Sequence, residues 1–285
     1  MHLNSPQLFL VAMPLGNPGD CSPRAREVLS NADVVLAEDT RRSGRLFAAL
    51  GIKARRFLSF QEHNEADRLP LVFEMFNQGL TLVLISDAGM PLLADPGYRL
   101  VRACREAGID VSVIPGPSAG ITALAGSGLA PLPHVFLGFL PRKQSDQRVL
   151  FTRFSSAGCT LVFYERKNRL AASLGVARQV LGKRECCVAR ELTKTFEEYI
   201  SFTLDTVPPL DHLLGEITVI IGPGMPENDV QSGDSGGGET LVSLIVQARE
   251  EMPHARPREI ARLVKERSQG ISMKSIYAMM AEEKG

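Results

Sequence analysis

The sequence has no tryptophan and only four tyrosines among 285 residues, and its 32 basic residues are matched by 32 acidic ones. Balanced charge disfavours a uniformly basic nucleic-acid-binding protein but leaves room for a local basic face. No run of about 18 apolar residues occurs, so no membrane span is predicted. The N-terminus has neither a basic segment nor a small-residue cleavage site, so we expect no secretory signal peptide.

Metal and redox motifs are also lacking. The five cysteines form no C-x-x-C pair, which is typical of reduced thiols in a cytoplasmic protein. The adjacent Cys186 and Cys187 admit a redox interpretation, but an apolar strand with buried thiols is the simpler one. The five histidines lie far apart in the sequence, so no zinc site is predicted. A Walker A sequence is absent too, so no P-loop is indicated.

The chain does contain the apolar content of a folded protein, with 44% hydrophobic and 22% charged residues, and a length typical of about two domains. In the first half, apolar runs alternate with helical patterns, which predicts an α/β domain with a parallel sheet. In the second half two strands follow each other without a helix between them, which predicts a mixed sheet. The predicted strands are 8–13, 33–37, 54–59, 80–86, 110–114, 135–139, 159–164, 185–190, 196–202 and 216–221, and the second half adds helices over 143–154 and 167–181.

These patterns predict four parts. Residues 1–130 form the first α/β domain and residues 131–222 the second. Residues 223–239 are rich in Gly, Ser, Asp and Pro and are expected to be a linker. Residues 240–285 show helical patterns with a basic middle segment, which fits either a nucleic-acid-binding helical module or a packing surface between subunits.

The loops that follow the five predicted strands of the first domain hold the most informative residues. Ligands of open parallel sheets bind beyond the carboxyl ends of the strands. As a set, these loops combine Gly and Pro with Asp, Glu, His and Arg, which suits close approach to a ligand, although turn chemistry accounts for any one of them alone. The loops are Pro14–Asp20, Glu38–Arg42, Gln61–Glu65, Ser86–Pro91 with Asp95–Gly97, and Pro115–Ala119.

Together these loops resemble one family. The stretches PLGNPGD, AEDTRR, EHNE, LISDAGMPLLADPG, PGPSAG, GFLPRK, TLVFYE and ARELTKTFEE occur in this order, and the resemblance runs from about residue 10 to 221. They are similar to the tetrapyrrole-methylase-like S-adenosylmethionine-dependent methyltransferases, and within these to the 16S rRNA (cytidine-2′-O)-methyltransferases. The resemblance implies a cytoplasmic, homodimeric enzyme of two α/β domains with a small C-terminal helical extension. Its cofactor is S-adenosylmethionine, bound between the domains, and its partner is 16S rRNA in the small ribosomal subunit.

The resemblance also implies which residues bind the cofactor. They belong to the loops after the first, fourth and fifth strands and to two segments of the second domain. They are Pro14, Ser86, Asp87, Ala88, Pro91, Ser118, Ala119, Tyr164, Glu165, Ala189, Arg190, Glu191 and Leu192.

The sequence departs from the family pattern at several places. Met90 stands where the family usually has Thr, which removes a hydroxyl near the expected cofactor site. Lys167 and Asn168 replace a usual Pro-His pair. The stretch Asp205–Leu214 is short and contains Pro208 and Pro209, which puts the usual helix before the last strand in doubt.

A ribose hydroxyl is a weak nucleophile near neutral pH, so a general base would assist methyl transfer. Four residues in the matching loops are candidates, and each has a turn or capping role as its alternative: Asp39, His63, Glu65 and Lys194. RNA binding needs cations for the phosphates. Residues 41–56 contain six basic residues and no acid, which indicates either an RNA track or a solvated helix face: Arg41, Arg42, Arg45, Lys53, Arg55 and Arg56.

Two other functions compete with this interpretation. A tetrapyrrole C-methyltransferase would share the fold but act on a flat macrocycle. A nucleic-acid-binding regulator would bind through the C-terminal helices while the α/β body senses a metabolite. Residues 240–285 have eight basic and six acidic residues, a small surplus for a segment that binds nucleic acid alone.

Overall fold

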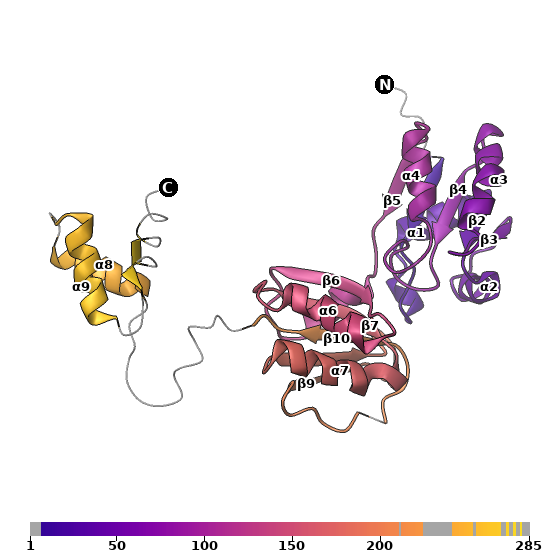
Figure 1. Cartoon of the computed structure of the whole chain (residues 1–285). Helices are drawn as coiled ribbons and strands as arrows, with labels where there is room; N and C mark the ends of the chain where they lie inside the picture. The colour runs from indigo at the N-terminus through magenta and orange to yellow at the C-terminus, as the bar shows by residue number, and fades with distance from the viewer. Residues whose placement is uncertain are drawn as a thin grey trace. The chain divides into compact units, whose positions relative to one another are not determined.

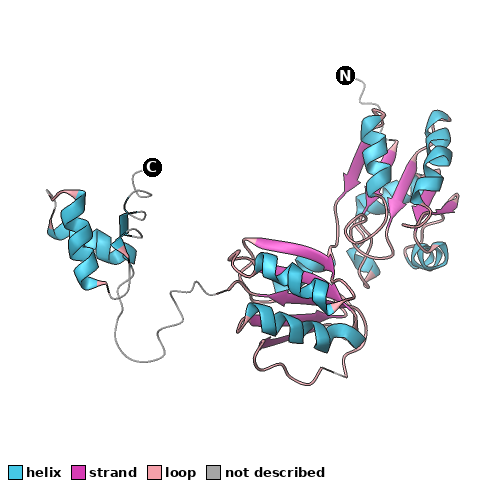
Figure 2. Ribbon diagram, viewed as in Figure 1, coloured by secondary structure: helices cyan, strands magenta, loops and turns pink. Residues whose placement is uncertain are grey.

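The computed structural model describes residues 7–210, 212–224, 241–252, 255–268, 272–273, 276–277 and 280. The chain divides into two compact units, Met1–Pro226 and Glu227–Gly285. The first unit contains two five-stranded sheets (Figures 1 and 2). The second contains helices. Most of the predicted linker 223–239 lies outside the described residues.

The first sheet is parallel, as predicted, with the strand order β3-β2-β4-β1-β5. Its elements alternate strand and helix. They are β1 (Leu8–Val11), the short 3-10 helix η1 (Pro18–Asp20), α1 (Pro23–Asn31), β2 (Val34–Ala37), α2 (Thr40–Ala49), β3 (Phe57–Ser59), α3 (Glu65–Asn77), β4 (Leu82–Ile85), α4 (Tyr98–Glu106) and β5 (Val111–Ile114).

Alternation within the strands builds a core on each face of this sheet. In β4, Val83 and Ile85 join one cluster with helices α1 and α2, whereas Leu82 and Leu84 join the other with α3 and α4. Successive side chains of a strand point to opposite faces, so a fully apolar strand feeds both cores. The central strands β1 and β4 are therefore fixed from two sides, and the loops that follow them start from rigid positions.

The second sheet is mixed, as predicted, with the order β6-β7-β10-β8-β9. Strand β6 is parallel to β7, and the remaining pairs are antiparallel. Its elements are β6 (His134–Phe139), α6 (Gln144–Phe154), β7 (Thr160–Glu165), α7 (Lys167–Leu181), β8 (Glu185–Arg190), β9 (Glu198–Thr203) and β10 (Ile217–Ile221). No helix is present among the described residues between β9 and β10, in agreement with the doubt raised by Pro208 and Pro209.

Helix α5 (Ala119–Gly126) follows the first sheet in the chain but packs on the second one. Its Ala123 and Leu124 join Val162 of β7, Ile220 of β10 and Leu15 of the loop after β1 in one buried cluster. The opposite face of the second sheet packs against α6 and α7. Helix α5 and Leu15 thus fasten the two sheets together, and the boundary at 130/131 stays a prediction.

The second unit contains α8 (Leu241–Glu251) and α9 (Pro257–Arg267). Its own core includes Leu244, Ile245, Ile260 and Val264, together with Ile276 from a further helical segment. The five cysteines are free and buried, and Cys186 and Cys187 lie in β8 as the apolar interpretation predicted. No helix among the described residues is long and apolar enough to cross a membrane.

Candidate functional site

The loops after β1 and β4 are joined where the site begins. Met13 N–H donates to the carbonyl of Gly89 at 2.8 Å, and Gly89 N–H donates back to the Met13 carbonyl at 2.9 Å. Because β1 and β4 are neighbours in the middle of the parallel sheet, their carboxyl ends emerge side by side. This bridge holds the two loops as one surface.

The loop that follows β4 is held in an unusual backbone conformation. Leu92 and Ala94 have φ values of 73° and 71°, and Gly89 and Gly97 have 74° and 123°. Left-handed backbone at a residue with a side chain costs about 1–3 kcal/mol and occurs mostly where function requires it. The Ser86 hydroxyl secures the start of this loop by contacts of 3.0 and 3.1 Å to the carbonyls of Ala88 and Gly89.

A cavity of about 660 Å³ lies beside this loop and is walled by residues from both sheets. This volume suits a ligand of the size of a nucleoside cofactor. One side is formed by the loops after β1, β4 and β5, and the other by β6, the β7–α7 turn and the start of β10. The lining residues are Leu15, Asp87, Ala88, Gly89, Met90, Leu93, Ala94, Asp95, Ser118, Ala119, Phe139, Tyr164, Glu165, Arg166, Lys167, Asn168, Gly215, Glu216, Ile217 and Thr218.

The β7 wall of the cavity is preorganised by aromatic and ionic contacts. The Tyr164 ring packs edge-on against Phe136 and Phe139, with centroids 4.9 and 5.4 Å apart. Its hydroxyl oxygen accepts the N–H of Gly120 at 3.2 Å, in the first turn of α5. The buried Glu165 carboxylate accepts the Ser173 hydroxyl at 2.7 Å and pairs with Arg169 at 3.2 Å.

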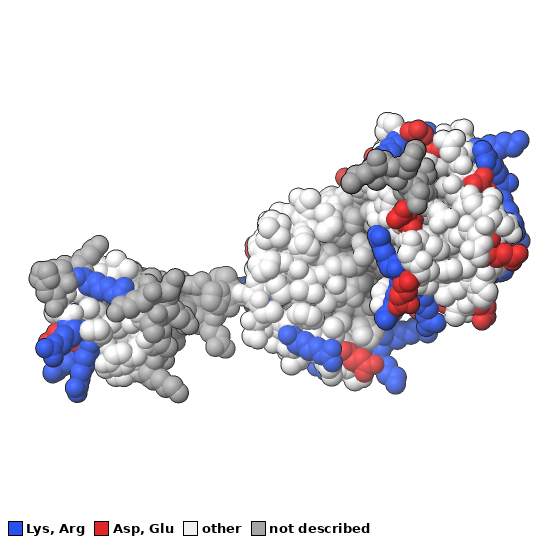
Figure 3. All heavy atoms as spheres, turned by 90° about the horizontal axis from the view of Figure 1, so that it is seen from above, with Lys and Arg blue, Asp and Glu red and all other residues white. Residues whose placement is uncertain are grey.

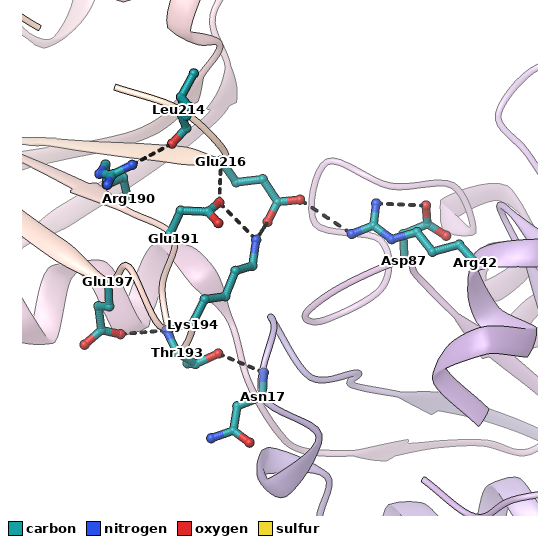
Figure 4. A network of polar contacts seen from close by, with 10 residues as sticks. All are labelled: Asn17, Arg42, Asp87, Arg190, Glu191, Thr193, Lys194, Glu197, Leu214 and Glu216. Atoms are coloured by element: carbon teal, nitrogen blue, oxygen red, sulfur yellow. Dashed lines mark hydrogen bonds and ion pairs between the residues drawn. The ribbon is translucent and has the colours of Figure 1, made fainter. Parts of the chain in front are cut away.

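An ionic network runs across the edge of the cavity between the two sheets (Figure 4). Arg42 at the start of α2 lies 3.4 Å from the Asp87 carboxylate and 3.6 Å from that of Glu216. Lys194 lies 3.1 Å from both Glu216 and Glu191. Burial disfavours a charged Lys194, but these two carboxylates outweigh it and raise its pKa. This network contains two cations, Arg42 and Lys194, and three carboxylates, and it links the two sides of the cavity.

A second link joins the loops after β1 and β8. The Asn17 N–H donates to the Thr193 hydroxyl at 3.2 Å, as Figure 4 shows. Glu191 and Thr193 have left-handed φ values of 48° and 64°, which turn the chain sharply after β8. The backbone at Gly16 approaches the aliphatic part of Lys194 so closely that a Cβ there would overlap it. The cavity is therefore bordered by a tightly fitted contact.

Two carboxyl groups of the cavity, those of Asp87 and Asp95, have raised pKa values. Burial raises the pKa of Asp87, although the Arg42 guanidinium acts in the opposite direction. Burial, together with the charges of Glu38 and Asp87, raises the pKa of Asp95 to about 7. Among the described residues the Asp95 side chain has no hydrogen-bonding or ionic partner. A carboxyl group that titrates near neutrality in a cleft is suited to proton transfer.

The predicted cofactor-binding residues divide into two groups. Six of them line the cavity: Asp87, Ala88, Ser118, Ala119, Tyr164 and Glu165. The others lie behind the wall or at its edge. Pro14, Pro91, Ala189 and Leu192 are buried, and Ser86 fixes the loop described above. Arg190 donates to the Leu214 carbonyl at 3.0 Å, which with Glu191 holds the segment leading into β10.

None of the four predicted base candidates lines this cavity, and the geometry gives three of them other roles. The Asp39 carboxylate caps α2 by accepting the N–H groups of Arg41 and Arg42, which lower its pKa. Glu65 is buried and accepts the Leu100 N–H in the first turn of α4 at 3.0 Å. Lys194 belongs to the ionic network, whose carboxylates favour its charged form, and His63 is exposed.

The six predicted RNA-binding cations are all exposed. Arg42 is engaged by Asp87 and Glu216, and Arg55 pairs with Asp33. The other four form no ion pair within the described part of the chain: Arg41, Arg45, Lys53 and Arg56. On the face drawn in Figure 3, basic and acidic side chains alternate over the part with the first sheet, so the positive surface is local.

Sequence reasoning did not select Asp95 or Glu216. Asp95 lies within a loop that the sequence singled out, and the signal that distinguishes it is its burial beside other carboxylates. Glu216 precedes β10 in a segment with no matching motif, and only the fold brings it to Arg42 and Lys194.

Comparison with known proteins agrees with this architecture. Residues 7–208 match the family model for tetrapyrrole (corrin/porphyrin) methylases. The chain belongs to the tetrapyrrole methylase family. This methylase is 43% identical over 234 residues to "Ribosomal RNA small subunit methyltransferase I" of Mycobacterium tuberculosis strain H37Rv, covering 81% of this chain and 82% of that one. It is 39% identical over 255 residues to the protein of the same name from Haemophilus influenzae, covering 86% and 87%.

Solved structures share the fold at lower identity. The methylase matches the methyltransferase CobJ with a TM-score of 0.60 and 18% identity, over 77% of this chain and 95% of that one. It matches uroporphyrin-III-C-methyltransferase from Thermus thermophilus with a TM-score of 0.53 and 20% identity, over 76% and 94%. These similarities confirm the predicted two-sheet α/β fold. Among the described residues of this methylase, no group of His, Cys, Asp and Glu forms a metal site.

Proposed function

We propose that this methylase transfers a methyl group from S-adenosylmethionine to the ribose 2′-oxygen of a cytidine in 16S rRNA of the small ribosomal subunit. The observation that carries the proposal is the identity of 39–43% to proteins named ribosomal RNA small subunit methyltransferase I over four-fifths or more of the chain. Identity to the tetrapyrrole-modifying enzymes is 16–20%, which speaks for the fold and not for their substrates.

The volume and the lining residues of the cavity support the binding of S-adenosylmethionine. The ligand has a sulfonium and an ammonium group, one carboxylate and a flat adenine, and when bound it supplies a methyl group to an attacking oxygen. Asp87, Asp95 and Glu216 provide negative charge, Arg166 and Lys167 provide positive charge, and Leu15, Leu93 and Phe139 provide apolar surface. We assign cofactor binding to the six predicted residues that line the cavity and a supporting role to the others.

Asp95 is the residue that we assign as proton acceptor. Its carboxyl group lines the cavity, lacks a partner among the described residues and titrates near neutrality. In the transfer, the ribose oxygen forms its bond to the methyl carbon while the methyl–sulfur bond breaks with its electron pair on sulfur. The hydroxyl proton passes to Asp95. We therefore propose Asp95 as the general base in place of the four sequence-based candidates, Asp39, His63, Glu65 and Lys194.

The protein surface supports the remaining parts of the proposal. The four unpaired cations at Arg41, Arg45, Lys53 and Arg56 provide contacts for RNA phosphates. The surface over β6 shows few charged side chains in Figure 3, and Leu132 before it is 77% exposed. An exposed uncharged surface of this kind fits the expected homodimer. We place the enzyme in the cytoplasm, where its rRNA partner is found.

The test is methyl transfer from labelled S-adenosylmethionine to small ribosomal subunits that lack the modification, followed by nucleoside digestion. Uroporphyrinogen is offered in a parallel reaction. We expect label in 2′-O-methylcytidine, and expect the Asp87→Ala variant to lose it. Label in the macrocycle alone would reassign the protein to tetrapyrrole chemistry. Nucleic-acid binding without methyl transfer to either acceptor would favour a regulator.

A further inference from the structure

A second cavity of about 360 Å³ adjoins the first and lies outside the proposed cofactor site. Ala94 and Asp95 line both cavities, so they form a common wall. The remaining lining residues come from the loops after β2, β3 and β4 and from the first residues of α3 and α4. They are Glu38, Glu62, Glu65, Pro96, Gly97, Tyr98 and Arg99.

The walls of the second cavity differ in their hydrogen-bonding character. Glu38 and Glu62 supply hydrogen-bond acceptors, and Arg99 supplies donors. The carboxylate of Glu38 forms no hydrogen bond or ion pair among the described residues, and burial raises its pKa. Tyr98 is 64% exposed, so its ring is available at the rim. Glu65 is already occupied by the Leu100 N–H.

We infer that this second cavity binds the base of the acceptor nucleotide, and that its carboxylate wall selects cytosine over uracil. The inference rests on the proposed function. Cytosine presents an exocyclic amine, which donates hydrogen bonds, and Asp and Glu are the side chains that accept them. Uracil presents a carbonyl oxygen at the same position, which cannot donate to the Glu38 or Glu62 carboxylate, and this difference is the basis for discrimination.

The common wall then explains how base and ribose are divided between the cavities. A base in the second cavity and the methyl donor in the first place the connecting ribose beside Asp95, the proton acceptor proposed above. An aromatic ring at the mouth suits a base taken out of an RNA stack. Helix α2 begins two residues after Glu38, so Arg41 and Arg45 lie on the element that leaves this cavity and can contact the flanking phosphates.

The experiment compares two single-stranded RNA hexamers that differ only in one central C or U, by fluorescence anisotropy with the full-length protein. We expect the C-containing RNA to bind about tenfold more tightly. The Glu38→Gln and Glu62→Gln variants are each expected to reduce this ratio to threefold or less. Glu27→Gln, on the exposed face of α1, is the matched control and is expected to keep the full ratio.

Binding of S-adenosylmethionine, measured by calorimetry, separates this inference from the proposed function. Equal binding of the two RNAs by the unmodified protein, with cofactor binding and rRNA methylation intact, would overturn the inference alone. So would a full C-to-U ratio in both glutamine variants. Absence of cofactor binding by the unmodified protein would instead overturn the proposed function. If Glu38→Gln weakens cofactor binding through misfolding, the C-to-U binding ratio of the Glu62→Gln variant tests the inference, because Glu62 is exposed.

Discussion

Replacing Asp95 by Asn should stabilise the protein while abolishing methyl transfer. A carboxyl group whose folded pKa lies above its unfolded value binds its proton more tightly in the folded state. Its contribution to the free energy of unfolding is therefore fully present below 3.8, the pKa in the unfolded state. This contribution is lost as the pH rises through about 7, the pKa in the folded state. Asparagine is neutral at every pH and avoids that loss, so the stability difference between Asp95→Asn and the unmodified protein should grow with pH.

The size of this effect follows from the pKa of Asp95. A rise from 3.8 to about 7 corresponds to about 4 kcal/mol if it acts in full. Water reaches the group through the two cavities that it lines, which reduces the effect, and part of it develops below pH 5. Between pH 5 and pH 8 we expect the variant to gain roughly 1–2 kcal/mol relative to the unmodified protein.

Urea unfolding of both proteins at pH 5, 6, 7 and 8 measures this gain, with the midpoint and slope fitted at each pH. Methyl transfer by the unmodified protein should rise about tenfold per pH unit below pH 7 and level off above it, because the acceptor must be deprotonated. A stability difference that stays constant from pH 5 to pH 8 would refute the environment inferred for Asp95. Normal transfer by Asp95→Asn would refute its role as proton acceptor.

Three further changes test other parts of the structure. Lys194→Met removes the cation shared by Glu191 and Glu216. We expect urea unfolding at low salt to show a free energy of unfolding lower by about 1 kcal/mol. An unchanged free energy of unfolding would contradict a stabilising network. Replacing Arg41 and Arg45 by Ala should reduce the salt dependence of RNA binding, with the slope of log K against log salt falling by about 1.4. An unchanged slope would place the phosphates elsewhere. Gly97→Ala places a Cβ on left-handed backbone and against a side chain of the β4 core. We expect thermal unfolding to show a loss of roughly 2–4 kcal/mol in the free energy of unfolding. An unchanged stability would contradict the close packing described for this loop.

The strands were predictable because strands buried on both faces of a sheet are short apolar runs bounded by glycine and polar residues. Predicted strand 185–190 coincides with β8, and 80–86 contains β4 with one or two extra residues at each end. Strand β3 is shorter than predicted, at Phe57–Ser59 against 54–59. Basic residues 55 and 56 precede it, and the exposed Arg55 side chain pairs with Asp33.

The site was less predictable because its chemistry depends on contacts between distant segments. The loop motifs led to Asp87, Ser118 and Tyr164, which do line the cavity. The acidity of a side chain, in contrast, depends on its burial and on charges that the fold brings near. The pKa of Asp95 is raised to about 7 first by burial and then by the charges of Glu38, which comes from the loop after β2, and of Asp87, and no local pattern encodes that arrangement. The ion pairs of Glu216 also depend on the fold, because Arg42 and Lys194 are far away from it in the sequence.

The position of Arg42 has a consequence for how the two substrates affect each other. Its guanidinium belongs to the basic segment 41–56, yet it also neutralises Asp87 and Glu216, which line the larger cavity. A phosphate that draws Arg42 away would leave these carboxylates more negative and the cavity more attractive to a cation. Thermodynamic reciprocity then requires a bound cation to strengthen phosphate binding by the same factor. One arginine is thus sufficient to make the binding of a positively charged methyl donor and of a polyanion cooperative, without any movement of the sheets.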